Sequence, residues 1–329
     1  MPEAETTFEA DRVASPAMDA FVRRIQAGDV RAMARAISAI EDNAPEATRL
    51  LKALFPHSGK ARIVGLTGAP GSGKSTLVDQ LAREYRKGGN TIGIIAVDPT
   101  SPYTGGAILG DRIRMQAHHA DAGIYIRSMA TRGFLGGLAR TTADVATVLD
   151  ASGKDLVLVE TVGVGQDEVD IVRLADVTIV ILVPGMGDDV QTIKAGIMEI
   201  ADIFVINKSD HEGSERVEKE IRALQSLATR KDGWVPPVVK TVATTAAGVQ
   251  ELAETIRKYR EFLVGKDLLR KRRAENWETR LVEMLRDTLL EKARGELSAG
   301  DLSRLAAEIA EHKRDPYSVI EEIVTRAAH

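Results

Sequence analysis

The stretch RIVGLTGAPGSGKSTLVDQLAREYRK, residues 62–87, decides the fold. Its first six residues form an apolar, β-rich run, and residues 76–87 have the pattern of a helix. Between them, GAPGSGKS (68–75) fits the pattern G-x-x-x-x-G-K-[ST]. A strand before this pattern and a helix after it are the context in which it forms a phosphate-binding loop, or P-loop. The stretch therefore predicts a nucleoside triphosphate site in an α/β domain.

The residues of this loop have separate predicted roles. Its glycines let the backbone wrap around the phosphates with N–H groups pointing inward, and the start of the helix adds its positive end. Lys74 is predicted to contact the β- and γ-phosphates, and Ser75 to ligate Mg²⁺. An ordinary strand-to-helix turn is the alternative, which the flanking elements disfavour. The predicted nucleotide contacts of the loop are Gly68, Ala69, Pro70, Gly71, Ser72, Gly73, Lys74, Ser75 and Thr76.

Short β-rich runs alternate with helical stretches on the C-terminal side of the loop. Near-continuous apolar strands interleaved with helices predict an α/β fold with a mostly parallel sheet covered on both faces. Ligands of such folds bind at the carboxyl ends of the strands. The predicted strands are 62–67, 91–98, 124–129, 156–161, 177–184, 203–208 and 237–243.

Helical patterns flank this region on both sides. Between Pro16 and Phe55, apolar residues recur at helical spacing, and AGD (27–29) makes a break after which Asp29 can cap the next helix. We expect three regions: a helical N-terminal extension (1–60), a P-loop domain (61–263) and a helical C-terminal arm (264–329).

The C-terminal arm is highly charged and carries an apolar stripe. The stripe is broken by LSAGD (297–301), resumes, and is ended by DP (315–316). Because the arm is too short for a sturdy core of its own, we interpret the stripe as an interface with the middle domain or with a second copy. The first part of the stripe consists of Trp277, Leu281, Met284, Leu285, Thr288 and Leu289.

The tetrapeptide NKSD, residues 207–210, ends another apolar strand. Asp210 can accept two hydrogen bonds from the N1–H and the exocyclic amine of guanine, and adenine lacks both donors in that arrangement. Asn207 is expected to brace neighbouring loops, and the stem of Lys208 to lie over the purine plane. A plain polar turn is the alternative, but after a P-loop the motif favours GTP over ATP. Further along, the backbone N–H groups of Ala243 and Thr244 are candidates to bind the guanine carbonyl.

Three acidic residues are candidates to complete a Mg²⁺ site. Mg²⁺ prefers oxygen ligands and usually keeps several waters, so one or two carboxylates suffice. Asp98 and Glu160 close predicted strands, where they should face the phosphates, and a solvated carboxylate is the alternative for each. For Asp111, capping a helix is nearly as good an interpretation as contacting the metal.

The composition excludes several classes of protein. The 329 residues include no cysteine, which rules out disulfides, thiolate metal sites and cysteine nucleophiles. A formal net charge of −4 gives no general affinity for nucleic acid or an anionic membrane. No apolar run approaches the roughly 20 residues that span a bilayer. The acidic N-terminus is unlike a secretory or mitochondrial leader, so we expect a cytoplasmic protein with no nucleic-acid or membrane partner.

The order of the long motifs resembles the MeaB/MMAA/ArgK family. Members are GTPases that serve as chaperones of adenosylcobalamin-dependent acyl-CoA mutases such as methylmalonyl-CoA mutase. The resemblance runs from about Met18 to DPYSVIEEI (315–323), and the long blocks are far more specific than the P-loop. Besides the P-loop and NKSD, the blocks are VDPTSPYTGGAILGDRIRM (97–115), IRSMATRGFLGGLA (126–139), VETVGVGQDE (159–168) and PGMGDDVQTIKAGIMEIAD (184–202).

This resemblance implies a P-loop G domain with a helical N-terminal extension and a C-terminal arm that forms a homodimer. It implies GTP/GDP and Mg²⁺ as cofactors, with Asp98, Asp111 and Glu160 around the metal and the γ-phosphate. Lys74, Asp98 and Glu160 are then the catalytic candidates, and Gly163 senses the γ-phosphate.

The resemblance also implies moving parts and a partner. Segments 98–115 and 160–170 correspond to switches. A further mobile segment, 184–196, includes Asp188, Gln191 and Lys194 and responds to the mutase. The family's role is to gate cobalamin delivery to the mutase and to protect or rescue the mutase from inactivation.

The chain departs from related sequences at three places. Val242-Ala243-Thr244 replaces Ser-Gly-Leu at the guanine-contacting loop, and RSMATRG (127–133) differs from the RPSPTRG of some methylmalonyl-CoA mutase partners, which hints at a different mutase. Val164 stands where Ras-like proteins often place a catalytic Gln, so no obvious group orients the attacking water. We therefore predict slow hydrolysis that a partner completes by ordering the loops.

Two other functions fit a P-loop chain. A nickel-insertion-type metallochaperone GTPase typically displays Cys/His clusters, whereas this sequence has no Cys and six His. A P-loop kinase needs an acceptor site, and no motif here indicates one, while NKSD indicates a base selector.

Overall fold

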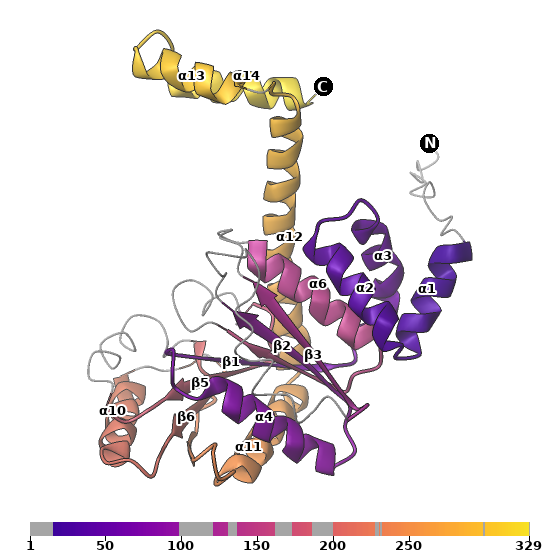
Figure 1. The fold of residues 1–329 in the computed structure, drawn as a ribbon. Coiled ribbons are helices and arrows are strands. Elements are labelled where there is room, and N and C mark those ends of the chain that lie inside the picture. The colour runs from indigo at the N-terminus through magenta and orange to yellow at the C-terminus, as the bar shows by residue number, and fades with distance from the viewer. Residues whose placement is uncertain are drawn as a thin grey trace, which may run out of the picture. The chain divides into compact units, whose positions relative to one another are not determined.

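The structure is a computed structural model, and Figure 1 shows the fold of the chain. Its described residues divide between two compact units, one up to Arg272 and one from Arg273 onward. None of the described helices combines the length and the apolar composition that crossing a bilayer requires. The structure describes residues 16–98, 121–130, 137–161, 173–185, 200–227, 230, 232–298 and 300–328.

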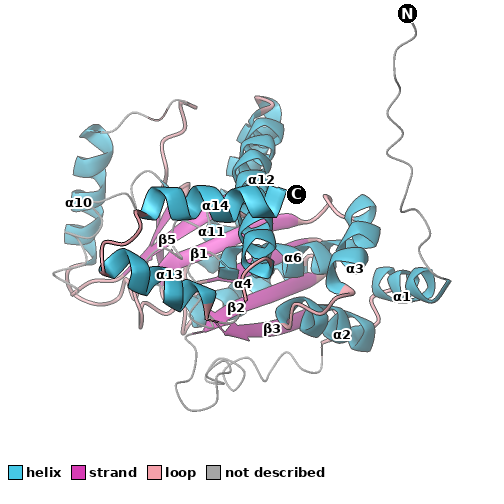
Figure 2. Cartoon of the chain, turned by 90° about the horizontal axis from the view of Figure 1, so that it is seen from above, coloured by secondary structure: helices cyan, strands magenta, loops and turns pink. Residues whose placement is uncertain are grey.

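The first unit is built on a sheet that has seven strands within the described residues. Every neighbouring pair runs parallel, in the order β3-β2-β4-β1-β5-β6-β7, which confirms the predicted α/β fold. In Figure 2 these strands lie side by side across the unit in magenta. The strands are β1 (Arg62–Gly68), β2 (Ile92–Asp98), β3 (Ile124–Ala130), β4 (Leu156–Glu160), β5 (Val177–Leu182), β6 (Ile203–Asn207) and β7 (Val238–Thr241).

Helices cover both faces of this sheet because its strands are apolar on both sides. On β2, Ile95 packs in the same buried cluster as α1, α2, α3 and α6, whereas Ile92 and Ile94 pack with α4 and α11. Figure 1 shows these two helical layers on either side of the strands. The helices are α1 (Pro16–Gln26), α2 (Val30–Glu41), α3 (Ala47–Leu54), the 3₁₀ turn η1 (Phe55–His57), α4 (Lys74–Lys87), α6 (Gly137–Ala151), α10 (Ser214–Leu227) and α11 (Val249–Gly265).

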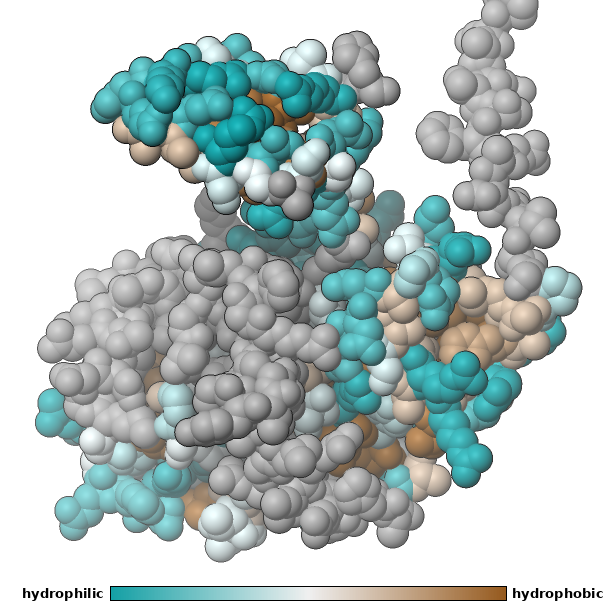
Figure 3. All heavy atoms as spheres, turned by 45° about the horizontal axis from the view of Figure 1, so that its top comes forward, coloured by the Kyte–Doolittle hydropathy of each residue, from teal (hydrophilic) through white to brown (hydrophobic). Residues whose placement is uncertain are grey.

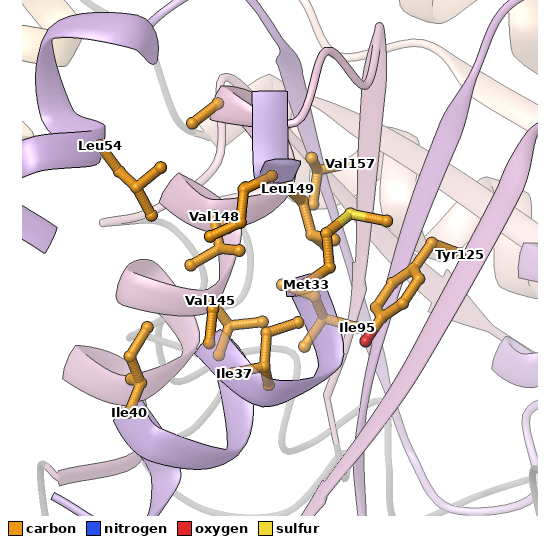
Figure 4. Close-up of a cluster of buried hydrophobic side chains, with 14 of the residues drawn as sticks. Met33, Ile37, Ile40, Leu54, Ile95, Tyr125, Val145, Val148, Leu149 and Val157 are labelled. Atoms are coloured by element: carbon orange, nitrogen blue, oxygen red, sulfur yellow. The ribbon is translucent and has the colours of Figure 1, made fainter. Parts of the chain in front are cut away.

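The N-terminal helices share a core with the sheet. Asp29 caps α2 as its sequence position suggested, with its carboxylate accepting from the N–H groups of Arg31 (2.9 Å) and Ala32 (3.1 Å). This cap sets α2 so that Met33 and Ile37 are fully buried in one cluster with residues of α6 and the sheet (Figure 4). The predicted extension is therefore an integral layer of the first unit.

The register between neighbouring strands brings the carboxyl ends of the central strands together at one edge of the sheet. Glu160, the last residue of β4, lies opposite Leu66 of β1 and Ala96 of β2. Gly68, at the end of β1, lies opposite Ile181 of β5. The P-loop that leaves β1 therefore begins between the ends of its two neighbouring strands.

The second unit is helical. The predicted break at 297–301 is confirmed, since α12 ends before it and α13 starts after Gly300. The helix predicted to end at DP (315–316) ends earlier, at Ala310, and Pro316 instead starts α14, a position that suits proline. No α12 side chain is buried in the structure, and brown side chains lie among the teal ones of this unit in Figure 3. The helices are α12 (Leu268–Gly295, which begins in the first unit), α13 (Asp301–Ala310) and α14 (Pro316–Ala328).

Candidate nucleotide-binding site

The P-loop connects β1 to α4 through backbone conformations that require glycine. Gly68, Gly71 and Gly73 have φ angles of 148°, 79° and 87°. A Cβ at Gly68 would clash with the carbonyl oxygen of Ile181, and one at Gly73 would clash with the side chain of Asn207. At Gly71 the same position is open space. The loop is thus closely packed against its neighbours at its two ends and open at its middle.

Two polar side chains of the loop, Lys74 and Ser72, are buried. The Lys74 ammonium group donates to the carbonyl oxygens of Gly68 (2.7 Å) and Ala69 (3.0 Å), and Lys74 is only 6% exposed. The Ser72 hydroxyl is buried and has no hydrogen-bond partner among the described residues. Such a curled loop with a lysine held at its centre fits a phosphate chain.

The first turn of α4 and the end of β4 meet at a hydrogen bond. The hydroxyl of Ser75 donates to Oε1 of Glu160 at 2.6 Å, and both side chains are buried. A hydroxyl and a carboxylate are hard oxygen ligands, and two such groups beside a P-loop suit Mg²⁺. The pair therefore fits the predicted metal position.

The other predicted metal and switch residues are less fully placed. Asp98 is the last residue of β2, two residues beyond Ala96, which lies opposite Glu160. The structure describes the backbone of Asp98 but not its side chain. The remaining predicted residues that lie outside the described part of the chain are Asp111, Gly163, Asp188, Gln191 and Lys194.

Asn207 joins the P-loop to the loop that follows β7. Its amide nitrogen donates to the carbonyl oxygen of Ser72 at 2.8 Å. Its amide oxygen accepts from the hydroxyl of Thr241 (3.1 Å) and the N–H of Ala243 (3.1 Å). Because Asn207 is 2% exposed, these bonds are sheltered from water and fix the two loops relative to each other.

Lys208 and Asp210 lie on the open side of this clamp. Lys208 has a left-handed backbone (φ 54°), and its ammonium group donates to the carbonyl oxygen of Gly71 at 3.0 Å. Asp210 is exposed, and within the described residues its carboxylate makes no hydrogen bond or ion pair. The carboxylate is therefore available to a ligand beside the P-loop.

The backbone N–H groups of Ala243 and Thr244, the two candidates to bind the guanine carbonyl, differ in whether they already make a hydrogen bond. The N–H of Ala243 is already donated to Asn207, as described above. Thr244 is exposed, and its N–H has no partner in the described part of the chain. Of the two, Thr244 is the one whose N–H remains available.

Sequence reasoning missed two residues that shape this region. Thr241 is fully buried at the end of β7, where it orients Asn207. Gly248 has φ 76°, and a Cβ there would clash with the carbonyl oxygen of Lys240. A glycine just after the turn residues that follow a predicted strand was the available signal for Gly248. The role of Thr241 depends on a contact that no local pattern reveals.

No group of three His, Asp or Glu side chains suited to hold a metal ion occurs among the residues that the structure describes. The Ser75–Glu160 pair offers two oxygen groups, and a metal ion there would need further oxygen ligands from outside these two side chains.

The parallel sheet, the P-loop and the NKSD loop at its carboxyl edge define a P-loop GTPase of the α/β class. Residues 33–298, well over half of the chain, match the family model described as "Methylmalonyl Co-A mutase-associated GTPase MeaB". The chain belongs to this family, which confirms the resemblance stated from its motifs.

Relatives and a solved structure agree with this assignment. The chain is 48% identical over 310 residues to a protein of Pyrococcus abyssi, covering 93% of this chain and 96% of the relative. It is 35% identical over 288 residues to the GTPase ArgK of Escherichia coli K12, covering 85% and 86%. The crystal structure of a LAO/AO transport system kinase has a TM-score of 0.69 and 26% identity, covering 97% of this chain and 100% of that one.

Proposed function

We propose that this protein is a GTP-hydrolysing switch that serves as chaperone of an adenosylcobalamin-dependent acyl-CoA mutase of the methylmalonyl-CoA mutase type. The observation that carries the GTP assignment is the clamp formed by Asn207 and Lys208. Both side chains donate to P-loop carbonyl oxygens, so they join the NKSD loop directly to the P-loop. Asp210 would bind the base on one of these loops while the other binds the phosphates, which is the arrangement that a single nucleotide requires. The family description supports a mutase as the partner.

In this proposal some residues bind the metal ion and others bind the phosphates directly. Ser75 and Glu160, together with Asp98 and Asp111, would hold Mg²⁺, which when bound would supply positive charge beside the phosphate oxygens. Lys74 leaves the carbonyl groups of Gly68 and Ala69 and binds the phosphates in their place. Its positive charge then stabilises the negative charge that develops in the transition state.

GTP hydrolysis by the protein alone is proposed to be slow, and a partner is proposed to accelerate it. Val164 provides no hydrogen-bonding group for the attacking water. The segments that carry Gly163 and the three residues Asp188, Gln191 and Lys194 are proposed to sense the γ-phosphate and the mutase. Through them, the nucleotide state gates cobalamin loading and the protection or reactivation of the mutase.

The metal assignment is tested by substituting Glu160. Glu160→Ala should strongly reduce Mg²⁺-dependent GTP hydrolysis, because the buried carboxylate beside Ser75 is lost, while GDP affinity is retained. Both are measured on the purified full-length protein, by phosphate release and by displacement of a fluorescent GDP analogue. The exposed Glu212→Ala is the matched control. Unchanged turnover in Glu160→Ala would contradict the assignment.

The same assay separates the competing functions. A GTPase transfers the labelled γ-phosphate to water, whereas a kinase transfers it to a protein or a small molecule. Equilibrium dialysis against nickel or zinc tests the metallochaperone alternative, which requires binding of the ion by the purified chain.

A further inference from the structure

A cavity of about 420 Å³ lies at the edge of the sheet opposite the P-loop. Arg62, the first residue of β1, lines this cavity, whereas the P-loop starts at Gly68, the last residue of the same strand. At about 3.3 Å per residue the strand separates the two by roughly 20 Å. The cavity is therefore distinct from the nucleotide site, and its volume falls within the roughly 300–1,000 Å³ of small-molecule sites.

Basic side chains dominate the cavity wall. Two acidic residues also line it, and the chain itself engages both carboxylate oxygens of Asp150 and one of Asp155. The carboxylate of Asp150 accepts from the backbone N–H groups of residues 59–61, at 2.5, 3.1 and 2.9 Å. The carboxylate of Asp155 accepts from the N–H (2.7 Å) and the hydroxyl (2.8 Å) of Thr91, and these bonds hold its pKa below the usual value. The basic residues of the wall are His57, Lys60, Arg62, Lys154 and Arg260.

Lys154 is a mostly buried residue whose ammonium group contacts no acidic group among the described residues. It is 8% exposed, and its ammonium group makes no hydrogen bond or ion pair with any residue that the structure describes. Burial and the nearby Arg86 lower the pKa of Lys154, and the negative charges of Asp121 and Asp155 oppose this shift only in part. Arg86 itself is held by both carboxylate oxygens of Asp121. A cation on a mostly buried side chain, with no acidic group in contact, gains from an anionic ligand that supplies the missing counter-charge.

Arg260 adds a second unpaired donor from another element. It extends from α11 to the same cavity, and its Nε is buried with no hydrogen-bond partner in the described part of the chain. Arg62 differs, because it donates to Asn90 (2.6 Å) and lies over the ring of Tyr85. The cavity is thus lined by two cationic side chains, Lys154 and Arg260, that no carboxylate of the described residues contacts, and by the exposed Lys60 and His57.

We propose that this cavity binds a phosphoryl group, either as free phosphate or as part of a small phosphomonoester, with Lys154 and Arg260 as its charged contacts. A guanidinium fork and an ammonium group together match the several acceptor oxygens and the double charge of a phosphoryl group. The volume leaves room for a small group attached to the phosphate. This inference is independent of the proposed function, since none of these residues belongs to the nucleotide site.

The test uses the full-length protein with its P-loop filled by Mg²⁺ and the non-hydrolysable analogue GMP-PNP. Inorganic phosphate and ribose 5-phosphate are titrated separately by calorimetry, with chloride keeping the ionic strength constant. We expect saturable binding at one site per chain. Lys154→Gln and Arg260→Gln should each weaken it at least tenfold, and Lys258→Gln, an exposed cation on the same helix as Arg260, should not. Tighter binding of the ester identifies a phosphomonoester site, and equal binding identifies a free phosphate site.

Two results would overturn the proposal. One is the absence of saturable binding of both probes, and the other is binding that neither Lys154→Gln nor Arg260→Gln weakens. Melting temperatures test the alternative that Lys154 stabilises the fold rather than binding phosphate. In phosphate-free buffer Lys154→Met should melt at the wild-type temperature or above, and phosphate should raise the melting temperature of the wild type alone. A lower melting temperature of this variant without phosphate would show that Lys154 serves the fold, and would also contradict the proposal.

Discussion

At the scale of single residues, the nucleotide site depends on contacts between segments far apart in the sequence. Ser75 and Glu160 are 85 positions apart and share a hydrogen bond, and Asn207 reaches back 135 positions to Ser72. Ser72, Ser75 and Asn207 were identifiable from the P-loop and the base-selecting motif, and Glu160 from its position at the end of a predicted strand. Their partners follow from the order of the strands, which the sequence does not reveal.

Asp210 gives the sharpest test of base selection. Its carboxylate is expected to accept two hydrogen bonds from guanine, and hydrogen bonds to a charged group contribute about 1.5–3 kcal/mol each. Asp210→Asn should therefore weaken GTP binding by at least about 100-fold. The new amide can donate to the carbonyl that xanthine carries in place of the guanine amine, so the variant should prefer XTP.

Competition between GDP and XDP for a fluorescent nucleotide measures this change, with Glu212→Gln as a control on the same exposed loop. If Asp210→Asn kept wild-type preference for GDP, the base would have to be selected elsewhere.

At the scale of elements, the start of β6 is held by a buried ionic network. Asp202 is 1% exposed and accepts hydrogen bonds from the Tyr259 hydroxyl (2.6 Å) and from Arg230 (3.1 Å). Its other oxygen accepts from the N–H of Thr178 (2.8 Å) and pairs with Arg272 at 2.9 Å. Burial and the negative charge of Asp202 raise the pKa of Tyr259, so its hydroxyl stays a donor. The network ties β5, β6, α11 and the first turns of α12 together.

Removing the charge at its centre should destabilise the first unit. Asp202→Asn leaves Arg230 and Arg272 without this buried partner, and breaking a buried ion pair costs about 3–5 kcal/mol. Tyr259→Phe removes a hydroxyl that donates to Asp202 and accepts from Arg230 (3.2 Å) and Arg272 (2.9 Å), and it should cost at least about 1.5–3 kcal/mol. Urea unfolding measures both, with the exposed Asp19→Asn as control. A loss below about 1 kcal/mol for Asp202→Asn would show that the network is solvated rather than structural.

Most elements of the first unit could be predicted from the sequence, because strands that are apolar on both faces have few other interpretations. The predicted strand 177–184 ends at Leu182 in the structure, since Pro184 and Gly185 form a turn in which Gly185 has φ 90°. The predicted strand 237–243 is also shorter, because Val242 instead makes an antiparallel bridge to Ala247. Turns that form through such contacts leave little trace in a local pattern.

The N-terminal helices illustrate a different limit. Their amphipathic spacing predicted helices and even the cap at Asp29, but an amphipathic pattern does not say what the apolar face packs against. In the structure that partner is α6, which lies more than 100 residues along the chain from Met33.

At the scale of the whole molecule, the C-terminal unit exposes an apolar face that would suit the homodimer implied by the family resemblance. Its exposed apolar side chains include Leu281, Leu285 and Leu289, which are 59%, 60% and 56% exposed and recur at helical spacing along α12. An extended apolar face of this kind marks an interaction surface.

Introducing charge on this face should separate the subunits. The double variant Leu285→Glu with Leu289→Glu should run as a monomer in size-exclusion chromatography with light scattering, whereas the wild type and Lys292→Glu, a polar position on the same helix, should run as dimers. A wild-type monomer at micromolar concentration, or a dimeric double variant, would contradict dimerisation through α12.

The central claim is that GTP hydrolysis is coupled to a mutase. It is tested most directly by measuring GTP turnover of the purified protein with and without a methylmalonyl-CoA mutase-type enzyme from the same source. We predict slow turnover alone and at least about a tenfold increase with the mutase, because partner-ordered loops supply what Val164 does not. A mutase that left both the turnover rate and the GTP affinity unchanged would contradict the account.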